Sequence, residues 1–171
     1  MYTVDQLDRV EELRDVPQSD VGAPLPAVVA DDGRVFLAYR VHTPDPNWDG
    51  RTARSVGPSS ENEAVALVTF VHPYAHFFGP PNDEAFHGHP LASRGLKPYG
   101  VFEIHGSSWI RRLERMNAVH PYHRPERFAE RRHFIFAFHD STFECVADGF
   151  HFEVRGGSLT SAVVELAGRI T

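Results

Sequence analysis

Several segments of the chain carry apolar residues at every second position or in short unbroken runs, and both patterns are typical of β-strands. A hairpin is predicted over 25–42, with Asp31-Asp32-Gly33 as its turn signal. The unbroken apolar run over 64–71 predicts a strand that is buried on both faces. Further strands are predicted over 99–105, 133–139, 142–148 and 150–154.

Other segments carry apolar residues three and four positions apart, as amphipathic helices do. Thr3 and Gln6 form a capping-box pattern ahead of an acidic N-terminal helix, which Pro17 ends. Ser107 or Ser108 is expected to cap a middle helix that runs through Asn117. A C-terminal helix is predicted over 158–169, and short helical turns are expected after His89-Pro90 and at Pro125.

The order of these elements predicts a single α+β domain over residues 1–171. We expect a mainly antiparallel sheet of about five or six strands, with N-terminal, middle and C-terminal helices on one side of it. Residues 43–62 are rich in proline and glycine and form a loop longer than most connections in a domain of this size.

Composition narrows the functional classes. The formal net charge is −6, and residues 1–50 hold ten acidic against four basic side chains, so non-specific nucleic-acid binding is not expected. The single cysteine, Cys145, excludes an intramolecular disulfide and a multi-thiolate metal site. The sequence shows neither a signal peptide nor an apolar run of spanning length, which predicts a soluble, cytoplasmic protein without a membrane partner.

The hairpin over 133–148 can be interpreted residue by residue. A turn centred on Asp140-Ser141 places Cys145 on an apolar core face among phenylalanines, where its thiol is expected to be inert. The other face is mixed, with His139 diagonal to Glu144 and His133 opposite Asp148. A carboxylate beside an imidazole orients the ring and raises its pKa, so His139 and Glu144 are predicted as a catalytic acid–base pair. The alternative is an ordinary half-exposed sheet face.

Four histidines fall within eighteen residues, and imidazole is a common ligand of transition metals. His72 and His76 are four residues apart, and His87 and His89 are two apart, so each pair is expected on one face of its segment. We predict these four histidines as ligands of a divalent transition metal. The alternative is that they are separate loop residues bonded to backbone or water, because the sequence contains no His-Glu-x-x-His motif.

Together these features predict a protein that binds a small molecule or a divalent metal in a histidine-rich pocket, with enzymatic activity as an open question. A second hypothesis is a non-catalytic interaction domain that uses the acidic N-terminal helix and the 43–62 loop. A third is a weak nucleic-acid binder, because the segment 111–132 holds seven arginines with aromatic residues among them. The last hypothesis requires those arginines to converge on one surface.

Overall fold

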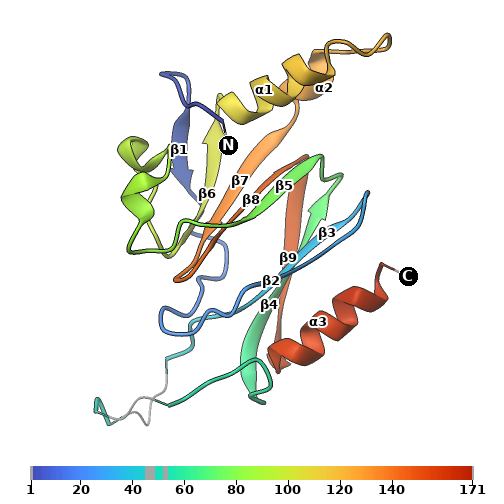
Figure 1. Ribbon diagram of the computed structural model, residues 1–171. Helices are drawn as coiled ribbons and strands as arrows, with labels where there is room; N and C mark the ends of the chain where they lie inside the picture. The colour runs from blue at the N-terminus through green and yellow to red at the C-terminus, as the bar shows by residue number, and fades with distance from the viewer. Residues whose placement is uncertain (1, 45–48, 52–53, 171) are drawn as a thin grey trace.

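The computed structural model describes residues 2–44, 49–51 and 54–170, and its strands form two antiparallel sheets (Figure 1). Five strands make the first sheet, in the spatial order Arg9–Glu12 (β1), Gly100–His105 (β6), Arg132–Ala137 (β7), Thr142–Ala147 (β8) and Ala75–Gly79 (β5). Four strands make the second sheet, in the order Ala27–Ala30 (β2), Val35–Arg40 (β3), Glu63–Val71 (β4) and Gly149–Gly157 (β9).

Helices cover the outer faces of both sheets. The C-terminal helix α3, Leu159–Gly168, packs on the four-stranded sheet. The middle helix α1, Ser108–Asn117, and the short helix α2, Glu126–Ala129, lie at one end of the five-stranded sheet (Figure 1). Two 3₁₀ turns, Phe86–Gly88 and Ala92–Arg94, pack on the same sheet nearer its β6 side.

The main core lies between the two sheets. The central strands are apolar on both faces, and their successive side chains point alternately into this core and toward the outer layer. Leu37 and Tyr39 of β3 point into this core, whereas Phe36 and Ala38 point toward α3. The five-stranded sheet contributes a layer of phenylalanines, namely Phe134, Phe136, Phe138 and Phe143, and Cys145 lies among them as predicted. The thiol of Cys145 is fully buried, which raises its pKa to about 12.

Two stretches of chain run from one sheet into the other. Residues 72–74 lead from β4 into β5, and Asp148 leads from β8 into β9. The strands on either side of these two crossings pair with each other. β4 pairs with β9 as far as Val71 opposite Gly149, and β5 pairs with β8 from Ala75 opposite Val146. The two sheets are therefore joined by one continuous pair of antiparallel segments.

The structure confirms the α+β class, the antiparallel pairing, both hairpins and the middle and C-terminal helices. The strands form two sheets, where the sequence predicted one, and β5 was not predicted. The 43–62 loop lies partly outside the described residues, which omit 45–48 and 52–53. Within the described part of the chain, no helix combines the length and the apolar character needed to cross a membrane.

The predicted N-terminal helix is wrong, because residues 9–12 form the edge strand β1 beside β6. The aspartates before it bond local backbone amides in a non-helical arrangement: Asp5 accepts from the Leu7 N–H, and Asp8 from the Asp5 N–H. Asp8 is buried and also accepts from the Ser108 N–H. The acidic helix surface proposed for a partner protein is thus absent from the structure.

Candidate functional site

A buried carboxylate, Glu144 of β8, is the centre of a polar cluster on the outer face of the five-stranded sheet. Its side chain is 2 % exposed and accepts three hydrogen bonds. Tyr2 Oη and His133 Nε2 donate to Oε2 over 2.7 and 2.9 Å, and His89 Nε2 donates to Oε1 over 3.2 Å. Residues from the N-terminus, a 3₁₀ turn and two strands therefore meet at one carboxylate.

The hydrogen bonds keep this carboxylate ionised in a dry environment. Burial opposes ionisation of Glu144, but the bonds from His133 and His89 outweigh it and lower the pKa of Glu144 from 4.5 to about 2. Burial, followed by the negative charge of Glu144, raises the pKa of the Tyr2 hydroxyl well above its ordinary value. Near neutral pH, the Tyr2 hydroxyl therefore stays protonated and donates its hydrogen bond to an ionised Glu144.

The second nitrogen of His89 fixes the protonation state of that ring. The backbone N–H of Leu91 donates to His89 Nδ1 over 3.1 Å, so Nδ1 carries no proton. His89 is therefore a neutral imidazole whose only N–H, at Nε2, points to Glu144. This side chain is 0 % exposed.

His133 lies between Glu144 and a serine hydroxyl. Ser107 Oγ is 2.9 Å from His133 Nδ1, on the side of the ring opposite Glu144. Ser107 is the N-cap of α1, and its Oγ also accepts the Ile110 N–H over 3.3 Å. The hydroxyl proton can point at Nδ1 while the Nε2–H of His133 points toward Glu144. Serine, histidine and glutamate form a continuous hydrogen-bonded chain.

Two cavities open on either side of this chain. The first, which we call the aromatic pocket, has a volume of about 260 Å³ and is lined by Tyr2, His76, Phe77, Trp109 and Glu144. The rings of Tyr2 and Trp109 stack with centroids 5.7 Å apart, and both meet the edge or face of His133 in a T-shaped arrangement. The pocket therefore has aromatic walls and an ionised carboxylate in its lining.

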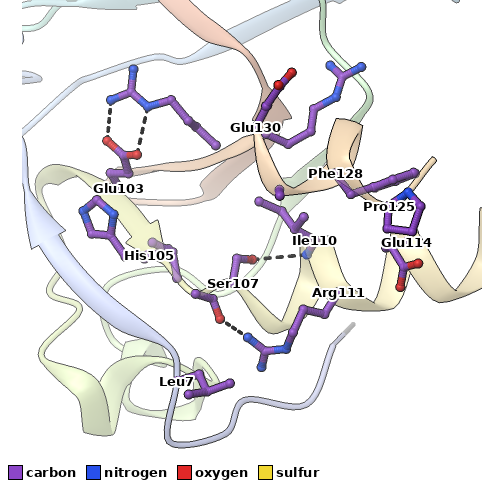
Figure 2. Close-up of a pocket in the computed structure, with 15 residues that line it drawn as sticks. Leu7, Glu103, His105, Ser107, Ile110, Arg111, Glu114, Pro125, Phe128 and Glu130 are labelled. Atoms are coloured by element: carbon purple, nitrogen blue, oxygen red, sulfur yellow. Dashed lines mark hydrogen bonds and ion pairs between the residues drawn. The ribbon is translucent and has the colours of Figure 1, made fainter.

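The second cavity, which we call the Ser107 groove, has a volume of about 590 Å³ and lies between the end of β6, α1 and α2 (Figure 2). Its lining includes Ser107, the apolar side chains of Leu7, Ile110 and Phe128, and the charged residues Arg111 and Glu114. His133 is 0 % exposed, and its two ring nitrogens link Ser107 in the lining of the groove to Glu144 in the lining of the aromatic pocket.

The predicted pair of His139 and Glu144 is not formed. His139 is a partly exposed turn residue whose ring bonds Asp140 over 2.9 Å, an interaction that raises the pKa of His139. The turn is centred on His139-Asp140, one residue earlier than predicted, and Phe138 bonds Ser141 across it. Every pairing thus moves by two residues, which preserves the faces but exchanges the partners. His133 lies opposite Val146 and diagonal to Glu144, so His133 is the true partner of this carboxylate.

The four predicted metal ligands are also separated. His72 is exposed and bonds Asp148, and His76 is exposed on β5 at the aromatic pocket. His87 lies in the 3₁₀ turn Phe86–Gly88 and is exposed, whereas His89 is the extended residue that follows this turn and is buried. Among the described residues, no group of three or more His, Cys, Asp or Glu side chains is placed to hold a metal ion.

Three of the seven arginines of segment 111–132 form ion pairs with carboxylates in the described part of the chain. Arg111 pairs with Asp5, Arg131 with Asp148, and Arg132 with Glu103. Their charges are balanced within the protein, which weakens the nucleic-acid hypothesis because phosphate contacts need available cations.

Sequence reasoning missed Tyr2 and the link from Ser107 to His133. Ser107 was identified only as a helix cap, and His133 was assigned the wrong partner. No signal near Tyr2 indicates that the N-terminus returns to β8, since this contact joins residues 142 positions apart. Comparisons with protein-family models, curated proteins and solved structures found no match to this chain.

Proposed function

We propose that the protein binds a small organic cation in the aromatic pocket and that Glu144, which stays ionised, orients His133 as a general base. The observation that carries this proposal is an ionised, buried carboxylate in the lining of an aromatic cavity. Groups with strongly shifted pKa values that gather beside a cavity are typical of functional sites, because burying them costs stability that a core without charges would not lose.

Charge favours a cation as the ligand. His89 is neutral, Tyr2 stays protonated, and His133 is neutral when it accepts from Ser107. Among the described residues, neither an arginine nor the lysine lines this pocket. Glu144 Oε1 accepts one hydrogen bond and Oε2 accepts two, so Oε1 is the oxygen with a lone pair left to accept a ligand N–H.

Shape and aromatic content point to a small ammonium compound. The aromatic faces of Tyr2 and Trp109 attract a cation, an interaction of about 0.5–2 kcal/mol for each favourable contact. The volume of about 260 Å³ lies below the usual range of pockets for drug-sized ligands, so the ligand is compact. A primary amine on an aromatic or short aliphatic group satisfies both conditions.

The test compares ammonium compounds with neutral molecules of the same shape. Benzylamine and benzyl alcohol are titrated against the protein at pH 7, and binding is followed by calorimetry and by the thermal midpoint of unfolding. We expect the amine to bind and the alcohol to bind at least about 10-fold more weakly, because only the amine has a charge to place at Glu144.

Three variants locate the site. Glu144→Gln and Trp109→Leu are expected to lose the preference for the amine, whereas His139→Gln, which changes a partly exposed turn residue outside the pocket lining, retains it. Equal binding of amine and alcohol, or a preference that survives Glu144→Gln in a folded variant, would contradict the proposal.

A further inference from the structure

The chain from Ser107 through His133 to Glu144 has the connectivity of a nucleophile, a general base and an orienting acid. Ser107 Oγ and His133 Nδ1 are 2.9 Å apart, and His133 Nε2 and Glu144 Oε2 are also 2.9 Å apart. We infer that Ser107 is a nucleophile that faces the Ser107 groove and cleaves carboxylic esters there. This inference rests on the acid–base part of the proposed function and does not require a ligand in the aromatic pocket.

The local fold places the serine where a nucleophile would be useful. Ser107 follows β6 and Gly106 and precedes α1, so it occupies a sharp strand-to-helix turn. Gly106 has a φ of +61°, and a side chain there would collide with the Leu7 carbonyl, so glycine is required for this turn. The turn holds the Ser107 hydroxyl against the ring of His133. Figure 2 shows Ser107 in the lining of the groove, where it accepts the Ile110 N–H.

The groove supplies surroundings that suit an ester. Ile110, Phe128 and Leu7 offer apolar contacts for an acyl chain. His133 is shielded from solvent, so its Nδ1 exchanges protons mainly with Ser107.

The reaction is balanced with these residues and water alone. Ser107 Oγ bonds to the carbonyl carbon while its proton moves to His133 Nδ1, and Glu144 stabilises the imidazolium that results. The tetrahedral intermediate then collapses, the C–O bond to the alcohol breaks, and the alcohol oxygen takes the proton from Nδ1. Water repeats the sequence on the acyl-serine, releasing the carboxylic acid and restoring Ser107.

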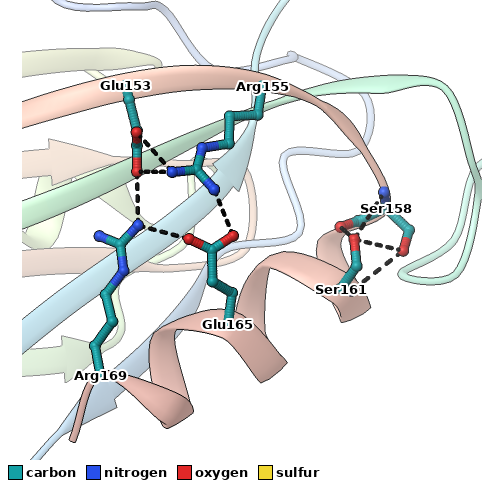
Figure 3. A network of polar contacts seen from close by, with 6 residues as sticks. All are labelled: Glu153, Arg155, Ser158, Ser161, Glu165 and Arg169. Carbon is teal, nitrogen blue, oxygen red and sulfur yellow. Dashed lines mark hydrogen bonds and ion pairs between the residues drawn. The ribbon is translucent and has the colours of Figure 1, made fainter.

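The chain contains a matched control serine. Ser158 is the N-cap of α3, and it is as buried as Ser107, with both residues 4 % exposed. Its hydroxyl is bonded to Ser161 of the same helix turn, in a capping box that contains no histidine (Figure 3). If helix capping or exposure alone determined reactivity, Ser107 and Ser158 would therefore react equally.

The experiment treats the full chain with diisopropyl fluorophosphate and maps adducts by peptide mass spectrometry. An Oγ–P bond forms, the P–F bond breaks and fluoride leaves, so no ester substrate need be known. We expect an adduct on Ser107 and none on Ser158 over the same time. Loss of the general base in His133→Gln is expected to slow labelling by about 10²–10⁴-fold.

Ser107→Asn keeps a good helix cap but removes the nucleophile, and it should remain folded and unlabelled at this position. The wild-type comparison of Ser107 with Ser158 needs no variant, so it stands even if His133→Gln does not fold. No adduct on Ser107, or equal labelling of the two serines, overturns the inference. Such a result leaves the amine-binding test unaffected, so the two proposals fail separately.

Discussion

Replacing Glu144 by glutamine should destabilise the protein by an amount that depends on pH. A carboxylate accepts from all three donors around it, whereas a glutamine amide has one oxygen and turns its NH₂ group toward one of these donors. Leaving a buried donor without an acceptor costs about 1–3 kcal/mol. Glutamine also resembles the uncharged, protonated form of Glu144. The lowered pKa of Glu144 therefore gives a second measure of the stability that the variant loses.

The lowering of the Glu144 pKa from 4.5 to about 2 corresponds to about 3 kcal/mol of stability near neutral pH. Because the folded-state pKa lies below the unfolded one, this contribution is complete above pH 4.5 and disappears as the pH falls through about 2. Linkage predicts that about 2 kcal/mol of it is already lost at pH 3. The glutamine variant has no such contribution at any pH.

The assay is urea unfolding from pH 3 to pH 7, followed by circular dichroism, for the wild type, Glu144→Gln and the exposed-residue control Glu84→Gln. We expect the free energy of unfolding of Glu144→Gln to lie about 3 kcal/mol below wild type at pH 7. The gap should narrow to about 1 kcal/mol at pH 3. A gap that stays constant with pH, or one as small as that of Glu84→Gln, would refute the assignment of Glu144 as a buried anion.

Three further predictions concern stability and reactivity. Gly106→Ala should destabilise the protein by more than about 2 kcal/mol in urea unfolding, because Gly106 has a left-handed φ and no space for a side chain. The control Gly168→Ala in α3 should be neutral or stabilising by up to about 1 kcal/mol. Glu63→Gln should cost about 3 kcal/mol in the same assay, since it removes the carboxylate at 2.8 Å from the buried guanidinium of Arg40 and leaves Asp20, at 3.6 Å, as the remaining charged partner among the described residues; a cost below about 1 kcal/mol would contradict this. Cys145 should not react with Ellman's reagent at pH 8 until the protein unfolds, and rapid reaction of the native protein would show that the strand is not buried.

The elements that could be predicted from the sequence were those with a strong period and a local stop signal. Both hairpins and the helices capped by Ser107 and Ser158 belong to this group, because a turn residue or a cap acts within a few positions. The N-terminal segment has a helical spacing, but Asp5 and Asp8 form turn-type bonds that compete with a helix, and the pairing of β1 with β6 decides the outcome.

The site itself was only half predictable. The face that carries Glu144 followed from strand alternation, which a two-residue change of pairing does not alter. Its partner did not follow, because the turn could be centred on either of two adjacent dipeptides and the choice exchanges His139 for His133. The contacts from Tyr2, His89 and Ser107 depend on packing between distant segments, for which the local pattern holds no information.

The passage of two neighbouring segments from one sheet into the other has a consequence for how the molecule opens. The strand that carries Glu144 continues directly into the strand beneath α3, and its neighbour β5 makes the same crossing in reverse. Neither sheet can open without breaking strand-pairing hydrogen bonds in the other sheet. Both sheets should therefore exchange their amide hydrogens as a single cooperative unit. The amides of β4 and β8 should then share one opening free energy, and the hydrogen bonds around Glu144 should persist until the protein unfolds as a whole.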